Sequence, residues 1–182
     1  EEKWELIKTK AGIDVDVFIS NEGYPDKITY DLVRAATEVL GLTSDQILEA
    51  FGEWWILRTA REGYGELMNA GGKSVPEFLE NLPTFHTRVT MIYPNLKPPR
   101  FDAVRVGEHG IHLHYHTHRP GLTRFVVGLL HGIGRMFATP LTVQVVDEDG
   151  TPLAGAEVVV REWDASALVR ARSPDGDDLV NC

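Results

Sequence analysis

The 182-residue chain is 43% hydrophobic and carries a formal net charge of −9, which favours one soluble domain with a sizeable core. The acidic balance argues against nucleic acid or an anionic membrane surface as a partner, because both require a positive field. The one cysteine, Cys182, excludes an internal disulfide, and a reducing, cytoplasmic location is therefore predicted. No apolar run is long enough to span a bilayer, so membrane insertion is not expected.

Four helices are predicted in the first 70 residues, where apolar residues recur at helical spacing. The first covers residues 4–11 and is closed by Gly12, and residues 13–19 form either a short strand or an irregular connector. The next helix begins near Thr29, whose hydroxyl can cap its first turn, and ends at Gly41. Further helices are expected from Ser44 to Gly63 and over residues 65–70.

Two helical pieces are predicted next, followed by strands. A capping box that begins at Ser74 opens the first piece. Pro83 requires a kink or a restart, with Asn81 as the cap of the second piece, and Pro94 ends it. Beyond it the pattern predicts a helix over residues 122–137 and strands over residues 101–106, 111–119, 141–146 and 156–163.

Three glycines weaken the last helix, residues 122–137. Gly128, Gly132 and Gly134 each cost about 1 kcal/mol relative to alanine, so the expected compensation is close approach by another backbone or a flat ring. The whole pattern predicts an α+β fold, with the helical N-terminal part packed on a small antiparallel sheet. Residues 1–163 form this domain, and residues 164–182 are read as a polar tail or linker.

His86 is the first candidate for chemistry. Leu82 and Val89 lie one helical turn away from it, so its imidazole emerges among apolar side chains rather than into bulk water. A histidine in such a place needs a partner. By itself, a lone histidine on an apolar helix face is more often a core residue than a metal ligand.

The strand over residues 111–119 supplies the second candidate. Tyr115, Thr117 and Arg119 alternate onto one face, where a phenol, a hydroxyl and a guanidinium together form a receptor for a carboxylate. A proline-rich segment, residues 93–100, separates this receptor from His86. A buried imidazole and a carboxylate clamp suit a flat cofactor with a metal at its centre and acids at its edge, and heme is such a cofactor.

The spacing resembles that of the heme nitric oxide/oxygen binding (H-NOX) domains, which include the sensor domain of soluble guanylate cyclase. The resemblance runs from about Trp4 to about Trp163 and extends to short segments shared with bacterial and cyclase-type members. It rests on His86, on Pro99 thirteen residues later, and on the family's Y-x-S-x-R motif, which reads Y-H-T-H-R here. Thr117 replaces the usual serine and keeps the hydroxyl.

The resemblance implies that the cofactor is heme b. It implies His86 as the proximal and only protein ligand of the iron, and Pro99 against the porphyrin. In the same way, Tyr115, Thr117 and Arg119 are implied to hold the heme propionates.

On the distal side, the resemblance implies Trp55, Phe125 and Leu129 as the residues that face the bound gas. Phe125 stands where oxygen-binding relatives place a tyrosine and has no hydroxyl. The expected diatomic ligands are therefore nitric oxide and CO, without a stable oxygen complex. Family members normally begin with a further helix that covers the distal side, and no such helix precedes Glu1 in this sequence.

The implied function is gas sensing and signal transduction, not catalysis. In the family, a shift of the helix that carries the proximal histidine is read by a histidine kinase, a cyclic-dinucleotide enzyme or a cyclase. Nucleophilic catalysis has no support, because no serine has a nucleophile-elbow context and no Gly-rich phosphate loop follows a strand.

A non-heme metal-binding or interaction module is the alternative. His112, His114, His116 and His118 alternate along the other face of the same strand, and His-x-His pairs in a strand can share one zinc, nickel or copper ion. A polar strand face that simply meets water explains the same pattern.

Overall fold

The structure, a computed structural model, describes residues 1–19, 22–107, 109–146, 152–158 and 166–172. No helix in this described part is long and apolar enough to cross a membrane. In chain order the elements are α1 Glu2–Ala11, α2 Asp26–Leu40, α3 Ser44–Trp54, the π-helix η1 Trp55–Ala60, α4 Arg61–Ala70, α5 Val75–Glu80, α6 Leu82–Ile92, β1 Arg100–Val106, β2 Gly110–His116, α7 Thr123–Met136, β3 Thr142–Val146, β4 Pro152–Val158 and β5 Ser166–Arg172.

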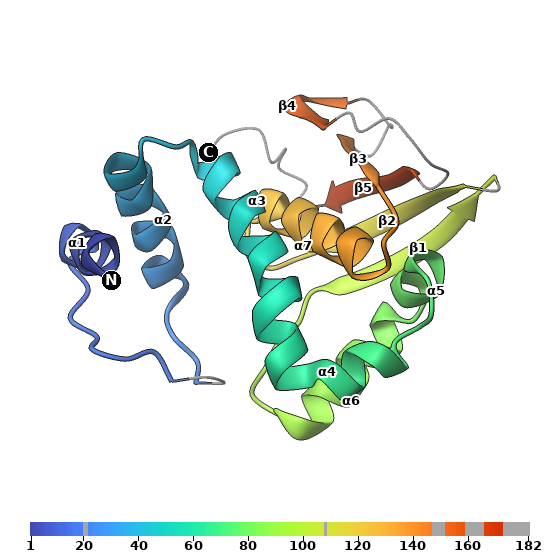
Figure 1. The fold of residues 1–182 in the computed structure, drawn as a ribbon, viewed down its shortest axis with the longest axis horizontal. Coiled ribbons are helices and arrows are strands. Elements are labelled where there is room, and N and C mark those ends of the chain that lie inside the picture. Colours follow the sequence, from blue (N-terminus) through green and yellow to red (C-terminus); the bar gives the residue numbers. More distant parts are fainter. Residues whose placement is uncertain (20–21, 108, 147–151, 159–165, 173–182) are drawn as a thin grey trace.

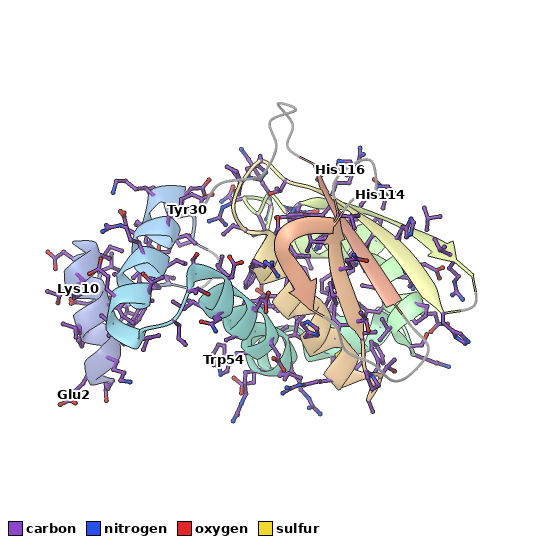
Figure 2. All side chains as sticks on the ribbon, turned by 90° about the horizontal axis from the view of Figure 1, so that it is seen from above. Glu2, Lys10, Tyr30, Trp54, His114 and His116 are labelled. Atoms are coloured by element: carbon purple, nitrogen blue, oxygen red, sulfur yellow. The ribbon has the colours of Figure 1, made fainter. Side chains whose placement is uncertain are left out.

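Helices α1 and α2 pack on each other at one end of the molecule (Figure 1) and lie beside α3 in the second view (Figure 2). As predicted, Gly12 ends α1 in the left-handed conformation, with φ 66°. Residues 13–19 form no regular element, which settles the choice between a strand and a connector. The pair has a small hydrophobic core of its own, made by Ile7, Ala11, Ala35 and Ala36.

Helix α2 begins earlier than predicted. Its first residue is Asp26, and Pro25 is the N-cap, so Thr29 lies inside the helix instead of capping it. Proline has no N–H to satisfy, and a carboxylate in the first turn suits the positive end of the helix dipole. The Thr29 hydroxyl is thereby left for a contact elsewhere in the fold.

The helix predicted to end at Gly63 continues to Ala70 and changes its geometry on the way. After α3 the chain follows the π-helix η1 and then α4, which is kinked at Tyr64 (φ −135°, ψ 23°). Thr43 caps α3 through a complete capping box with Gln46. π-Helical turns are rare in proteins, and those that occur are often found at functional sites. This one begins at Trp55.

Helix α7 packs against α3 through its glycines. A Cβ atom on Gly128 would lie 2.1 Å from the Glu49 carbonyl oxygen, and one on Gly52 would lie 2.2 Å from the Phe125 carbonyl oxygen. At Gly132 a Cβ atom would meet the Ile56 side chain at 2.7 Å. The close approach predicted from the glycines is therefore made by another backbone at Gly128 and by a side chain at Gly132.

The strands form one sheet in the order β1-β2-β5-β3-β4. The β1–β2 and β3–β4 pairs are antiparallel, as predicted, and β5 is parallel to both β2 and β3. β5 falls within the stretch read as a polar tail. Its backbone supplies hydrogen-bond partners to two strands that would otherwise present open edges toward each other. The predicted strand over residues 156–163 overlaps β4, but its residues 159–163 lie outside the described part of the chain, as does Cys182.

The main core lies between the sheet and the helices, and the α+β prediction is confirmed. Along β2 the side chains alternate between buried and half-buried, so that Ile111, Leu113 and Tyr115 face the core. They meet buried residues of α7, such as Val127 and Leu130. The inner face of β2 is thereby placed between α7 and the helices that precede β1.

Candidate functional site

His86 lies on α6 between two aromatic rings. Its ring centroid is 5.9 Å from that of Phe85 and 5.7 Å from that of Phe101. Burial lowers the pKa of the imidazole, and a hydrogen bond with the Pro99 backbone partly opposes this. In a neutral imidazole one ring nitrogen carries a hydrogen, and the other can act as a metal ligand.

Phe101 connects His86 to the strand that carries the predicted clamp. Its ring stacks on Tyr115 with the centroids 5.3 Å apart and the planes 24° from parallel. Tyr115 is 3% exposed, and burial raises the pKa of its phenol, while a hydrogen bond with Thr117 opposes the rise. The sequence analysis did not single out Phe101, although it is the second residue after Pro99 and lies in a predicted strand.

The clamp strand is shorter than predicted. β2 ends at His116, whose partner is Arg100. The next pair would involve Pro99, which cannot donate a hydrogen bond to the ladder. Thr117 and Arg119 therefore lie in a turn, in which the Arg119 N–H donates to Thr117 Oγ1 at 3.0 Å.

Arg119 reaches from this turn to α2, the helix on which Figure 2 labels Tyr30. Its Nη2 donates to Thr29 Oγ1 at 2.9 Å, and its Nε lies 2.8 Å from Asp26 Oδ1. The second contact is short but poorly directed, because the buried Nε–H has no acceptor in line with it among the described residues. The Tyr30 hydroxyl adds a bond to the Pro120 carbonyl at 2.8 Å. The guanidinium thus keeps donor capacity for a further carboxylate.

His86, its ring neighbours Phe85 and Phe101, and the clamp residues lie around one cavity of about 410 Å³. A cavity of this size is typical for a small-molecule or cofactor site. Its wall is mostly apolar, and none of the described residues that line it is Asp or Glu. The lining includes every residue that the sequence analysis assigned to a cofactor: His86, Pro99, Tyr115, Thr117, Arg119, Trp55, Phe125 and Leu129.

A second cavity, of about 370 Å³, adjoins the first and shares Trp55 and His86 with it. Trp55 stacks on Tyr64 with the ring centroids 6.4 Å apart, and Tyr64 meets Tyr93 edge-on at 5.8 Å. The sequence analysis assigned no role to the two tyrosines at this site. Tyr64 lies at the kink of α4. The direction in which a kink turns a side chain cannot be predicted from the local sequence pattern.

A sequence profile of the haem-NO-binding family matches residues 1–145. The chain belongs to this family. It is an H-NOX domain, as the spacing of the site residues predicted, and H-NOX domains form a family of heme-based gas sensors.

Curated relatives of this H-NOX domain include two proteins of Caenorhabditis elegans. Soluble guanylate cyclase gcy-37 is 34% identical over 134 residues, which cover 72% of this chain and 19% of that protein. Soluble guanylate cyclase gcy-31 is 24% identical over 148 residues, which cover 81% of this chain and 21% of that protein. The chain thus spans about a fifth of the length of these relatives.

Solved structures confirm the fold. A mutant of an H-NOX protein from S. oneidensis, in the Fe(II) ligation state, matches with a TM-score of 0.68 at 19% identity, over 75% of this chain and 73% of that one. The Fe(II) unliganded H-NOX protein from K. algicida matches with a TM-score of 0.64 at 20% identity, over 75% and 74% of the two chains. At these identities the likeness concerns the fold alone.

The residues present fit a heme. His86 offers a neutral ring nitrogen, and the buried Nε–H of Arg119 lacks an aligned acceptor beside Tyr115 and Thr117. The alternative site on the opposite face of β2 fits less well. Across the described ranges, no group of three or more His, Cys, Asp or Glu side chains is placed to hold a metal ion.

Proposed function

We propose that this domain binds heme b and senses nitric oxide and CO at the ferrous iron. His86 is the iron's only protein ligand, and Tyr115, Thr117 and Arg119 hold the propionates. The observation that carries the proposal is one mostly apolar cavity, on whose wall the half-buried His86 lies together with Pro99 and the clamp residues Tyr115, Thr117 and Arg119.

The signalling step is assigned to α6. When bound, the heme would supply an iron that takes up a diatomic gas. His86 would hold that iron and Pro99 would lie against the porphyrin, so a change in how these two residues hold the group would let α6 shift. Phe85 and Phe101 flank His86, and Phe85 also meets Phe78 of α5 with the ring centroids 5.8 Å apart. A shift of α6 would therefore also move its contacts with α5 and β1. The two positions of α6 form a two-state element that the gas biases by binding one state better.

The choice of gas follows from the distal residues. A stable oxygen complex is favoured by a hydrogen-bond donor in a dry pocket, whereas nitric oxide needs no such donor. Phe125 lines the cavity without a hydroxyl and packs on Phe51 with the ring centroids 5.2 Å apart. The Trp55 indole is the one N–H donor among Trp55, Phe125 and Leu129. We expect no lasting oxygen complex in air.

The domain itself is not catalytic in this proposal. A partner reads the shift of α6: a histidine kinase, a cyclic-dinucleotide enzyme or a cyclase. Support for a cyclase comes from the relatives, which are named soluble guanylate cyclases and are about five times longer than the matched segment.

The experiment is an absorption spectrum of the purified protein with His86→Gly as the variant. The unaltered protein should show a near-stoichiometric Soret band, and the variant should bind heme weakly or only with added imidazole. An unchanged ferrous spectrum in the variant without imidazole contradicts the role of His86. Absence of a Soret band in the unaltered protein after reconstitution contradicts the whole proposal.

A pair of variants tests the clamp. Arg119→Ala should cost more heme affinity than Thr117→Ala, because a charge-assisted bidentate pair is stronger than a neutral hydroxyl contact. Heme affinity is measured by titration of the heme-free protein. Equal affinities in the two variants would count against the clamp as described.

A further inference from the structure

Heme b carries two carboxylates, and the clamp contains one cation. Arg119 is already engaged by α2, through Asp26 and Thr29, before any cofactor carboxylate is counted. Its guanidinium would therefore be shared between Asp26 and a propionate. A second carboxylate at the same edge calls for a second cation, because an anion taken partly out of water is stabilised by an opposite charge beside it.

Lys97 lies on the wall of the cavity of about 410 Å³, where Lys97 and Arg119 are the Lys and Arg side chains among the described residues. The same wall holds His118, and its described residues include no Asp or Glu. Lys97 is exposed, and no ion pair joins it to another of the residues that the structure describes. Lys97 is thus an exposed cation on the cavity wall, without an acidic partner in the described part of the chain to hold it elsewhere.

The backbone around Lys97 restricts where this charge can go. The residue precedes Pro98, which biases Lys97 to the extended region, and Pro98 itself is followed by Pro99. Lys97, Pro98, Pro99 and His86 all line the same cavity. The two fixed proline φ angles that follow the lysine limit how far its backbone can move from this wall.

We propose that Lys97 adds a charged contact to one of the two heme propionates, beside the clamp of Tyr115, Thr117 and Arg119. The inference rests on the proposed function, since it needs heme at His86. It adds to the Y-x-S-x-R motif a residue outside that motif, in the loop before β1.

The test measures the rate at which heme leaves the reconstituted domain for an apoglobin acceptor. Lys97→Gln should accelerate the loss about twofold to fivefold, the range of an exposed ion pair, whereas Lys97→Arg should restore the original rate. With heme dimethyl ester, which has no carboxylates, the unaltered protein and Lys97→Gln should lose the cofactor equally fast. Lys73→Gln is the matched control, because Lys73 is exposed and does not line the cavity. Higher salt should reduce the difference.

Two results overturn the inference. One is that Lys97→Gln and the unaltered protein lose heme at the same rate, whether or not His118→Gln accelerates the loss. The other is that the acceleration by Lys97→Gln persists with the dimethyl ester. In each case the reconstituted protein still shows the Soret band of bound heme, and the proposed function stands. Failure of the unaltered protein to bind heme at all overturns both.

Discussion

Replacement of Gly128 by alanine tests the packing of α7 on α3. The new Cβ atom would lie 2.1 Å from the Glu49 carbonyl oxygen and 2.8 Å from its carbonyl carbon, so the helices must separate. Overpacking costs about 3 kcal/mol at the upper end of its usual range, and alanine recovers about 1 kcal/mol of helix propensity. We expect the free energy of unfolding to fall by about 2 kcal/mol, the difference of these two values.

Urea denaturation of the heme-free domain measures this change, with Gly63→Ala as the control. Gly63 lies in α4 and has no atom within 4 Å of an added Cβ, so its replacement should raise the free energy of unfolding by up to about 1 kcal/mol. Phe125 and Leu129 flank Gly128 on the cavity side of α7, and Gly128→Ala should also weaken heme binding. If Gly128→Ala is as stable as the unaltered protein, the close approach of the two helices is refuted.

Three further predictions concern pH, backbone strain and gas choice. Burial lowers the pKa of His86 and of His131, so the unfolded chain takes up protons first as the pH falls. The free energy of unfolding of the heme-free domain should then decrease below pH of about 6.5, and His86→Gln should flatten this dependence in urea titrations at several pH values. Ala138 has a positive φ of 51°, a conformation that is strained for alanine and not for glycine. Ala138→Gly should therefore raise the urea midpoint and the free energy of unfolding, the latter by up to about 1 kcal/mol. A lower midpoint would contradict backbone strain at this residue. Phe125→Tyr should move the ferrous protein toward oxygen binding in air-saturated buffer, whereas a persistent pair of oxy bands in the unaltered protein would contradict the proposed choice of gas.

The candidate site could be predicted because its signals are local. His86 stands on an apolar helix face, and Tyr115, Thr117 and Arg119 alternate over five residues. Spacing within one element is fixed by the 3.6-residue helix and the two-residue strand repeat, and therefore it can be read without knowing the fold. The residues lie around one cavity even though β2 stops at His116.

The contacts of the site came only from tertiary structure. Thr29 was predicted as a helix cap, but it accepts a hydrogen bond from Arg119, 90 residues away. Phe101 was read as part of a strand, and its role as the ring between His86 and Tyr115 depends on how α6 crosses β1 and β2. No periodicity within a segment specifies such a neighbour.

Patterns within single segments were enough to predict the α+β class, most helices and strands, the candidate proximal histidine and the candidate clamp, and they required a close packing partner for the glycines of α7. The folded chain was needed to show that this partner is, at Gly128, the backbone of α3, that Arg119 also contacts α2, and that β5 joins the sheet in parallel. The physical reason is that propensity and periodicity act between residues near in the chain. The identity of a packing partner depends on which distant backbones can approach and satisfy each other's hydrogen bonds.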